Sequence, residues 1–81
     1  MKIDLPALEA FVSVAEFGSF TRAAHHLNLS QTAVTHRIIK LERNLGAKLL
    51  RRSTRDVTLT RAGSELLPKL KIILSDLHAE M

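Results

Sequence analysis

The positions of apolar residues predict a first helix between Asp4 and Gly18. Asp4 can cap its amino end, because an aspartate side chain accepts hydrogen bonds from the first free backbone N–H groups. Gly18 can end it, because glycine readily adopts the left-handed conformation that follows many helices. The apolar residues are spaced i, i+3, i+4 and i+7 and therefore share one helix face. They are Leu8, Phe11, Val12 and Ala15.

Two further helices are predicted, joined by a short turn. Ser19 can cap the second helix, and the two alanines in its apolar stripe let another helix approach closely. Asn28 tolerates the conformation that leaves this helix. Ser30 can cap the third helix, which we expect to end at Gly46. The stripe of the second helix consists of Phe20, Ala23, Ala24 and Leu27.

The third predicted helix has an apolar face and an opposite polar face. Its apolar residues fall together at about 100° per residue, which predicts that they belong to the core. They are Val34, Ile38, Leu41 and Leu45. The opposite face carries Thr32, His36, Ile39 and Arg43, with Thr35 and Lys40 at its margins and Gln31 in the first turn.

A polar helix face that follows a tight turn is typical of helix-turn-helix proteins that read DNA. An α-helix fits the major groove, where each base pair presents its own donors, acceptors and methyl groups. Threonine and glutamine can donate and accept hydrogen bonds there, and basic side chains can reach guanine or phosphate. The same residue types can also form an ordinary solvated helix surface.

Two short runs, Leu49–Arg52 and Val57–Leu59, predict a β-hairpin around a polar tip. Arg55, in the tip, can enter a narrow minor groove, and Arg51 and Arg52 can neutralise phosphates. We interpret the hairpin as a DNA-contacting wing. The alternative is a solvated hairpin with no role in DNA binding.

A last helix is predicted from Thr60, its candidate cap, to Met81. Pro68 removes one intrahelical hydrogen bond and predicts a bend or a local weakening. The helix has a broad apolar face whose spacings of three and four residues are typical of a coiled-coil seam, although part of the face can pack on the rest of the chain. We expect a homodimer. Its predicted contact residues are Leu67, Leu70, Leu74 and Leu77.

Positive charge is concentrated in the middle of the chain, whose overall net charge is +4. The segment from Arg22 to Arg61 contains nine lysines and arginines against two acids, whereas the flanks together contain three bases and six acids. This concentration within a helix-turn-helix pattern favours contact with nucleic acid over a merely solvated surface. We therefore expect double-stranded DNA as a partner.

Length and composition exclude several other function classes. The 81 residues suit one small domain, and without cysteine there is neither a disulfide framework nor a thiolate metal site. His25 and His26 point about 100° apart on a helix and cannot hold one metal ion together. No glycine-rich phosphate loop or nucleophile elbow is present, so we expect no metal, no cofactor and no enzymatic activity. No apolar run approaches the ~20 residues of a membrane span, and we expect a cytoplasmic protein.

Two stretches of the sequence resemble a known family. They are SFTRAAHHLNLSQTAVTHRIIKLERNLGAKLLRR, which begins at Ser19, and the later VTLTRAG. Together they are similar to the N-terminal DNA-binding region of LysR-type bacterial transcriptional regulators. The similarity covers nearly the whole chain and is specific because several residue pairs occur in the same order. These pairs are Ser19-Phe20, Ala23-Ala24, Ser30-Gln31, Leu41-Glu42, Leu45-Gly46 and Leu59-Thr60.

The resemblance implies a mainly α fold with two parts. Residues 1–60 would form a winged helix-turn-helix with a three-helix core and a β-hairpin wing, and residues 61–81 a linker helix for dimerisation. The implied function is sequence-specific binding of double-stranded DNA, as a homodimer on an interrupted inverted repeat at promoters, with a tetramer as an alternative in a full-length protein. Family members continue into a two-lobed effector-binding domain that is absent from this chain, so we expect a small-molecule effector to act only through that domain.

The resemblance also implies roles for individual residues. Arg55 corresponds to the wing arginine that enters the minor groove, and Ser30 and Arg52 lie near phosphates. Thr32 stands where proline is frequent, and Ile39 stands where a polar or basic residue is usual and can meet a thymine methyl. The predicted DNA contacts are Ser30, Gln31, Thr32, Thr35, His36 and Lys40 on the third helix and Arg52 and Arg55 on the wing.

Two other functions are compatible with the sequence. One is a winged-helix module whose basic face binds an acidic protein, and the other is a dimerisation domain whose DNA contacts are incidental. Sequence-selective duplex binding that weakens steeply with added salt distinguishes a DNA reader from both.

Overall fold

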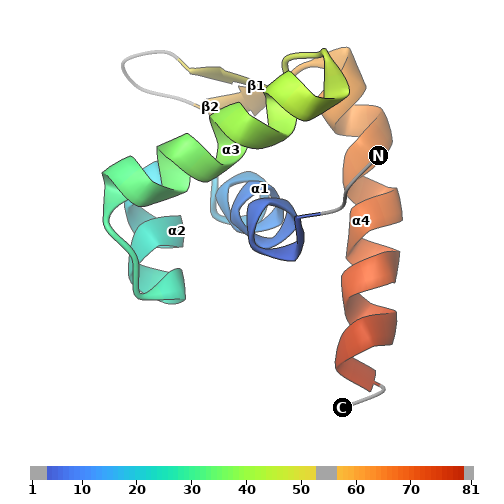
Figure 1. The fold of residues 1–81 in the computed structure, drawn as a ribbon, viewed down its shortest axis with the longest axis horizontal. Coiled ribbons are helices and arrows are strands. Elements are labelled where there is room, and N and C mark those ends of the chain that lie inside the picture. Colours follow the sequence, from blue (N-terminus) through green and yellow to red (C-terminus); the bar gives the residue numbers. More distant parts are fainter. Residues whose placement is uncertain (1–3, 53–56, 80–81) are drawn as a thin grey trace.

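A computed structural model describes residues 4–52 and 57–79 of the chain (Figure 1). The elements occur in the predicted order, with three helices followed by a hairpin and a final helix. The mainly α, winged helix-turn-helix prediction is therefore confirmed. The bounds are α1 Leu5–Phe17, α2 Phe20–Leu27, α3 Gln31–Leu45, β1 Leu50–Arg52, β2 Val57–Leu59 and α4 Arg61–Ala79.

The ends of the first three helices follow the residues expected to cap and end them. At the amino ends, the side chains of Asp4, Ser19 and Ser30 accept hydrogen bonds from the N–H groups of Ala7, Arg22 and Ala33, at 3.4, 3.1 and 3.0 Å. At the carboxyl ends, Gly18, Asn28 and Gly46 adopt the left-handed conformation with φ of 63°, 57° and 69°. Local sequence thus defines where each helix begins and ends.

Helix α1 is the centre of the fold. It contacts α2, α3, α4 and β2, and Figure 1 shows it end-on with the other helices around it. The buried face of α1 differs from the predicted one. Leu8 and Phe11 are buried as predicted, whereas Val12 and Ala15 are only half-buried. The reason is that a helix packed on several sides buries more than one stripe. The additional buried residues are Ala7, Ala10 and Val14.

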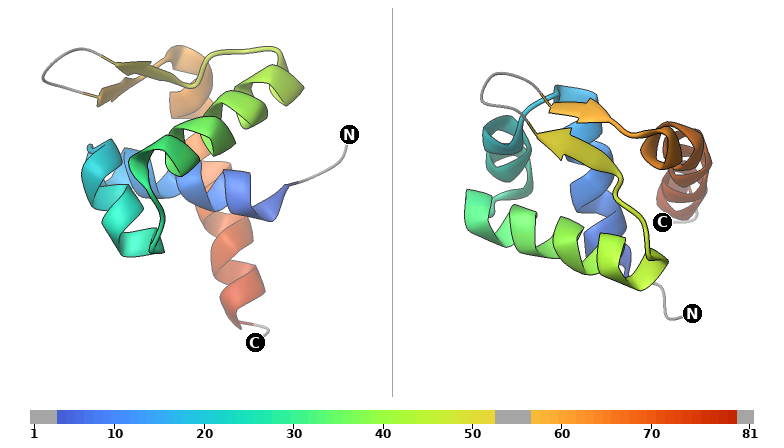
Figure 2. Two further views of the ribbon diagram at one scale, coloured as in Figure 1. Left: turned by 60° about the vertical axis from the view of Figure 1, so that its left-hand side comes forward. Right: turned by 90° about the horizontal axis from the view of Figure 1, so that it is seen from above.

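The hairpin forms as predicted, with β1 and β2 antiparallel and Arg51 opposite Thr58. Leu49 precedes the strand and is buried in the core, and its carbonyl accepts a hydrogen bond from the Thr60 N–H at 3.1 Å. Figure 2 shows the strands extending from the carboxyl end of α3 back toward the amino end of α2. The predicted tip, including Arg55, lies outside the described residues.

Helix α4 begins after Thr60, as predicted. The Thr60 hydroxyl accepts a hydrogen bond from the Gly63 N–H at 3.1 Å and donates one to the Lys48 carbonyl at 2.6 Å. The helix continues through Pro68, and Lys71 pairs with Glu16 of α1 at 3.1 Å. No helix within residues 4–52 and 57–79 is long and apolar enough to cross a membrane.

Candidate nucleic-acid interface

The polar face of α3 is turned away from the core. Val34, Ile38 and Leu41 are buried beneath the helix, as predicted, whereas Leu45 is only half-buried. On the opposite side the side chains are open to solvent, and Thr35 is half-buried at the margin. The exposed residues are Gln31, Thr32, His36, Ile39, Lys40 and Arg43. This arrangement presents a rigidly packed helix with hydrogen-bonding and basic groups on its free face.

The amino end of α3 is also exposed, at Ser30 and Gln31. The Ser30 hydroxyl accepts a hydrogen bond from the Ala33 N–H. The first turn of α3 contains no acidic residue. The partial positive charge of a helix amino end attracts anions. The start of α3 can therefore bind a phosphate group.

Lys40 lies on the same face of α3 but has an anionic neighbour. Its Nζ is 3.2 Å from Oδ2 of Asp4, the cap of α1. The hydrogen bond from Lys40 is the main reason that the pKa of Asp4 lies below its usual value. Because the pKa of Asp4 is lowered in the folded state, its ion pair with Lys40 contributes fully to stability at pH values above the ordinary pKa of aspartate. This contribution is lost as pH falls through the lowered pKa.

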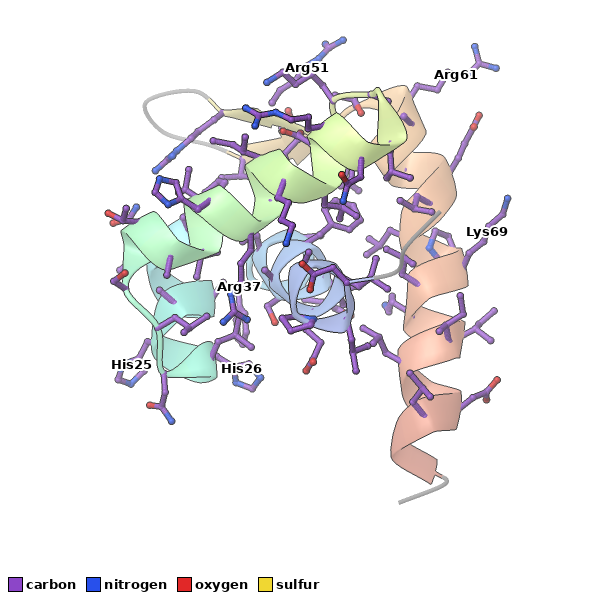
Figure 3. The ribbon with its side chains drawn as sticks, viewed as in Figure 1. His25, His26, Arg37, Arg51, Arg61 and Lys69 are labelled. Atoms are coloured by element: carbon purple, nitrogen blue, oxygen red, sulfur yellow. The ribbon has the colours of Figure 1, made fainter. Side chains whose placement is uncertain are left out.

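The two wing arginines in β1 are placed differently. Arg51 is exposed and extends outward from the top of the molecule (Figure 3). The guanidinium carbon of Arg52 lies 4.1 Å from the centre of the Phe20 ring, a cation–π contact that joins the wing to the start of α2. Arg52 remains exposed and is available to phosphate. The structure thus brings Arg52 to the same side of the molecule as α2, whereas Arg55 is outside the described residues.

No structural role was predicted for Glu42 of α3, although the Leu41-Glu42 pair is part of the family resemblance. Glu42 is 8% exposed, and its Oε2 accepts hydrogen bonds from the N–H groups of Leu49 and Leu50 at 2.7 and 3.3 Å. Lys48 lies 3.9 Å from Oε1, but its side chain is largely exposed, so the backbone donors are the main partners. Glu42 therefore ties α3 to the start of the hairpin. The available signal was its spacing, because it follows the core residue Ile38 by four positions.

The four residues predicted to form a dimer seam have different environments in a single chain. Leu70 and Leu74 are 4% and 8% exposed. Leu67 is half-buried, whereas Leu77 is 43% exposed. Ile73, on the same helix, is 47% exposed. The exposed apolar side chains of α4 are thus Ile72 (63%), Ile73 and Leu77, whereas two of the four predicted seam residues are packed in the single chain.

The adjacent histidines lie away from the α3 face. Figure 3 shows His25 and His26 at the end of α2 that is remote from the wing. The His26 ring centre is 5.2 Å from that of Phe17. Within the part of the chain that the structure describes, no three histidine, aspartate or glutamate residues gather as a metal site.

Comparison with known proteins identifies the family. Residues 5–64 match the family described as bacterial regulatory helix-turn-helix protein, lysR family. The HTH-type transcriptional regulator YbhD of Escherichia coli K12 is 47% identical over 74 residues, which are 91% of this chain and 23% of YbhD. The chain spans about a quarter of the length of YbhD and of the similar regulator YfeR of Shigella flexneri.

Solved structures of similar sequence have the same fold. The CbnR DNA-binding domain in a DNA complex superposes with a TM-score of 0.89 at 36% identity, covering 96% of this chain and 90% of that domain. The BenM DNA-binding domain with catB site 1 DNA gives 0.91 at 35% identity, covering 96% and 88%. On the evidence of the matched segment, the relatives and the fold, this chain belongs to the LysR family of bacterial regulatory helix-turn-helix proteins.

Proposed function

We propose that this chain is the DNA-reading part of a bacterial transcriptional regulator and is not an enzyme. The observation that carries the proposal is the free polar face of α3 above a buried apolar face. Relatives named as transcriptional regulators and similar domains solved in DNA complexes support it. Binding to promoter DNA would place the protein in the cytoplasm.

In the proposed complex, α3 lies in the major groove. Thr32 and His36 are exposed in the amino-terminal half of α3 and can meet base edges, while Gln31 and the half-buried Thr35 border them. Phosphates are bound by the α3 amino end and by basic residues such as Arg52, which supply affinity rather than sequence choice. Arg55 is proposed, on its place in the wing sequence, to enter the flanking minor groove.

We further propose that two copies bind an interrupted inverted repeat. A two-fold dimer places its two α3 helices in major grooves that lie one helical turn of DNA, or a multiple of it, apart. The exposed apolar side chains of α4, including Ile73 and Leu77, support this proposal, because burying them removes apolar area from water.

The test of the proposed function is duplex binding measured against salt and sequence. We expect a preferred site to be selected from a random duplex library and bound with an affinity that falls steeply as salt is added. Binding without sequence preference at every salt concentration would instead support the acidic-partner module or the dimerisation domain. Fluorescence anisotropy with the selected and scrambled duplexes makes the comparison.

His36→Ala should reduce the preference for one base pair by about 1 to 2 kcal/mol if the imidazole contacts a base. The matched control is His25→Ala, which removes the same side chain from an exposed helix position remote from the wing. Binding to a panel of single-base variants of the selected site provides the measurement. An identical preference profile for both variants would exclude a direct base contact by His36.

Leu77→Asp should shift the protein from dimer toward monomer while leaving the helical signal unchanged, because Leu77 is 43% exposed in the single chain. Leu70→Asp should lower the melting temperature instead, because Leu70 is packed in the core. Sedimentation velocity and circular dichroism separate the two effects. A wild-type protein that is monomeric at all concentrations, or a dimeric Leu77→Asp variant, would contradict this seam.

A further inference from the structure

The Asp4 carboxylate connects the start of α1 to the middle of α3. Its Oδ1 accepts the Ala7 N–H at 3.4 Å, and its Oδ2 lies 3.2 Å from the Lys40 ammonium. The Asp4 side chain thus caps a core helix and also pairs with the positively charged Lys40 on the proposed DNA-binding surface of α3.

Lys40 is well placed to contact DNA. It follows His36 by four positions and so lies about 40° around the helix from it, on the exposed face. Its side chain is 65% exposed even with Asp4 beside it. Lys40 can therefore swing from Asp4 to a nearby phosphate without any change in the backbone.

We propose that Asp4 is a positioning residue that restrains Lys40 and so limits the sequence-independent affinity of the α3 surface. The proposal rests on the proposed DNA-binding function. A phosphate must displace the carboxylate from Lys40, and the displaced carboxylate then stands beside a polyanion. Both effects weaken phosphate contacts and leave contacts to DNA bases unchanged. Asp4 therefore increases the share of the binding free energy that depends on DNA sequence.

The position of this ion pair sets it apart from others in the described residues. Glu16 pairs with Lys71 between α1 and α4, and Arg61 pairs with Glu65 within α4. Neither of these pairs includes a residue of α3. In the Glu42–Lys48 pair, the α3 member is a buried acid, whereas Lys40 is an exposed base. The Glu16–Lys71 pair is therefore a control with the same charges and a similar distance, 3.1 Å, at a different place.

The experiment compares Asp4→Asn with Glu16→Gln. Asparagine caps a helix about as well as aspartate, so Asp4→Asn removes the charge and keeps the cap. Each substitution changes the net charge equally. The probe is a random-sequence duplex of 24 base pairs, titrated by fluorescence anisotropy over a series of salt concentrations.

We expect Asp4→Asn to tighten binding about two- to fivefold at low salt and to steepen the salt dependence, with a clearly smaller change for Glu16→Gln. In a Lys40→Gln background, the effect of Asp4→Asn should fall to that of Glu16→Gln. This second result assigns the effect to the pair, because a general increase in positive charge acts with or without Lys40.

The outcomes separate the two proposals. A wild-type chain that binds no duplex at any salt concentration overturns the proposed function and this inference with it. A wild-type chain that binds, with equal changes for Asp4→Asn and Glu16→Gln, overturns only the role of Asp4. An Asp4→Asn effect that persists in full without Lys40 also overturns it.

Discussion

Gly63→Ala should lower the free energy of unfolding by about 3 kcal/mol. A Cβ at this position would lie 2.1 Å from the carbonyl oxygen and 3.0 Å from the carbonyl carbon of Leu49, and 3.2 Å from Leu59 Cδ2. The first two atoms belong to the backbone of Leu49, directly before β1, so α4 and this segment would have to move apart. Urea unfolding at a fixed protein concentration, followed by circular dichroism, measures the loss.

The sign of this effect is informative because helix propensity predicts the opposite. Gly63 lies in the first turn of α4, where alanine is favoured over glycine by up to about 1 kcal/mol in a helix without tertiary contacts. Ser64→Ala, at the adjacent exposed position, is the control and should change stability by less than about 0.5 kcal/mol. A Gly63→Ala protein as stable as the wild type would show that α4 does not press on the wing.

Glu42→Ala should cost about 3 kcal/mol of stability and should also weaken DNA binding. The substitution leaves the N–H groups of Leu49 and Leu50 without their carboxylate acceptor, and the Leu49 group is buried. Hydrogen bonds to charged groups contribute about 1.5 to 3 kcal/mol each, and an unpaired buried donor carries a further penalty. Because these bonds join α3 to β1, their loss also removes a restraint on the wing.

Hydrogen exchange of individual amides tests this local explanation. The Leu49 and Leu50 amides should exchange faster in Glu42→Ala under native conditions, whereas amides within α1 should change only as far as global stability falls. Glu65→Ala is the control, because Glu65 is an exposed acid that pairs within α4. Unchanged protection at Leu49 and Leu50 would contradict the proposed tie between helix and wing.

Features that depend on neighbouring residues were predictable from the sequence. Ser19 and Ser30 cap the helices they precede, and Gly46 ends α3, because these effects depend on side chains and backbone preferences within a few positions. The two faces of α3 were also predictable, since helical geometry fixes which residues share a side. For that reason the exposure of Thr32 and His36 matches the expectation.

Contacts between distant segments were not predictable in the same way. From the sequence, a glutamate at position 42 is compatible with an exposed helix surface. Only the packing of the chain places the N–H groups of Leu49 and Leu50 where they can bind its carboxylate. In the same way, spacing alone could not decide which apolar residues of α4 face the core. Leu70 is buried in the single chain while Leu77 is exposed, because α1 packs only along part of the helix.

The sequence by itself determined the order of elements, the helix ends, the two sides of α3 and the concentration of positive charge. These properties follow from local preference and helical periodicity. Only the tertiary structure decided that Glu42 holds the wing, that Asp4 reaches Lys40 and that Arg52 stacks on Phe20. Each of these contacts joins separate elements, and their geometry depends on how the elements pack around α1.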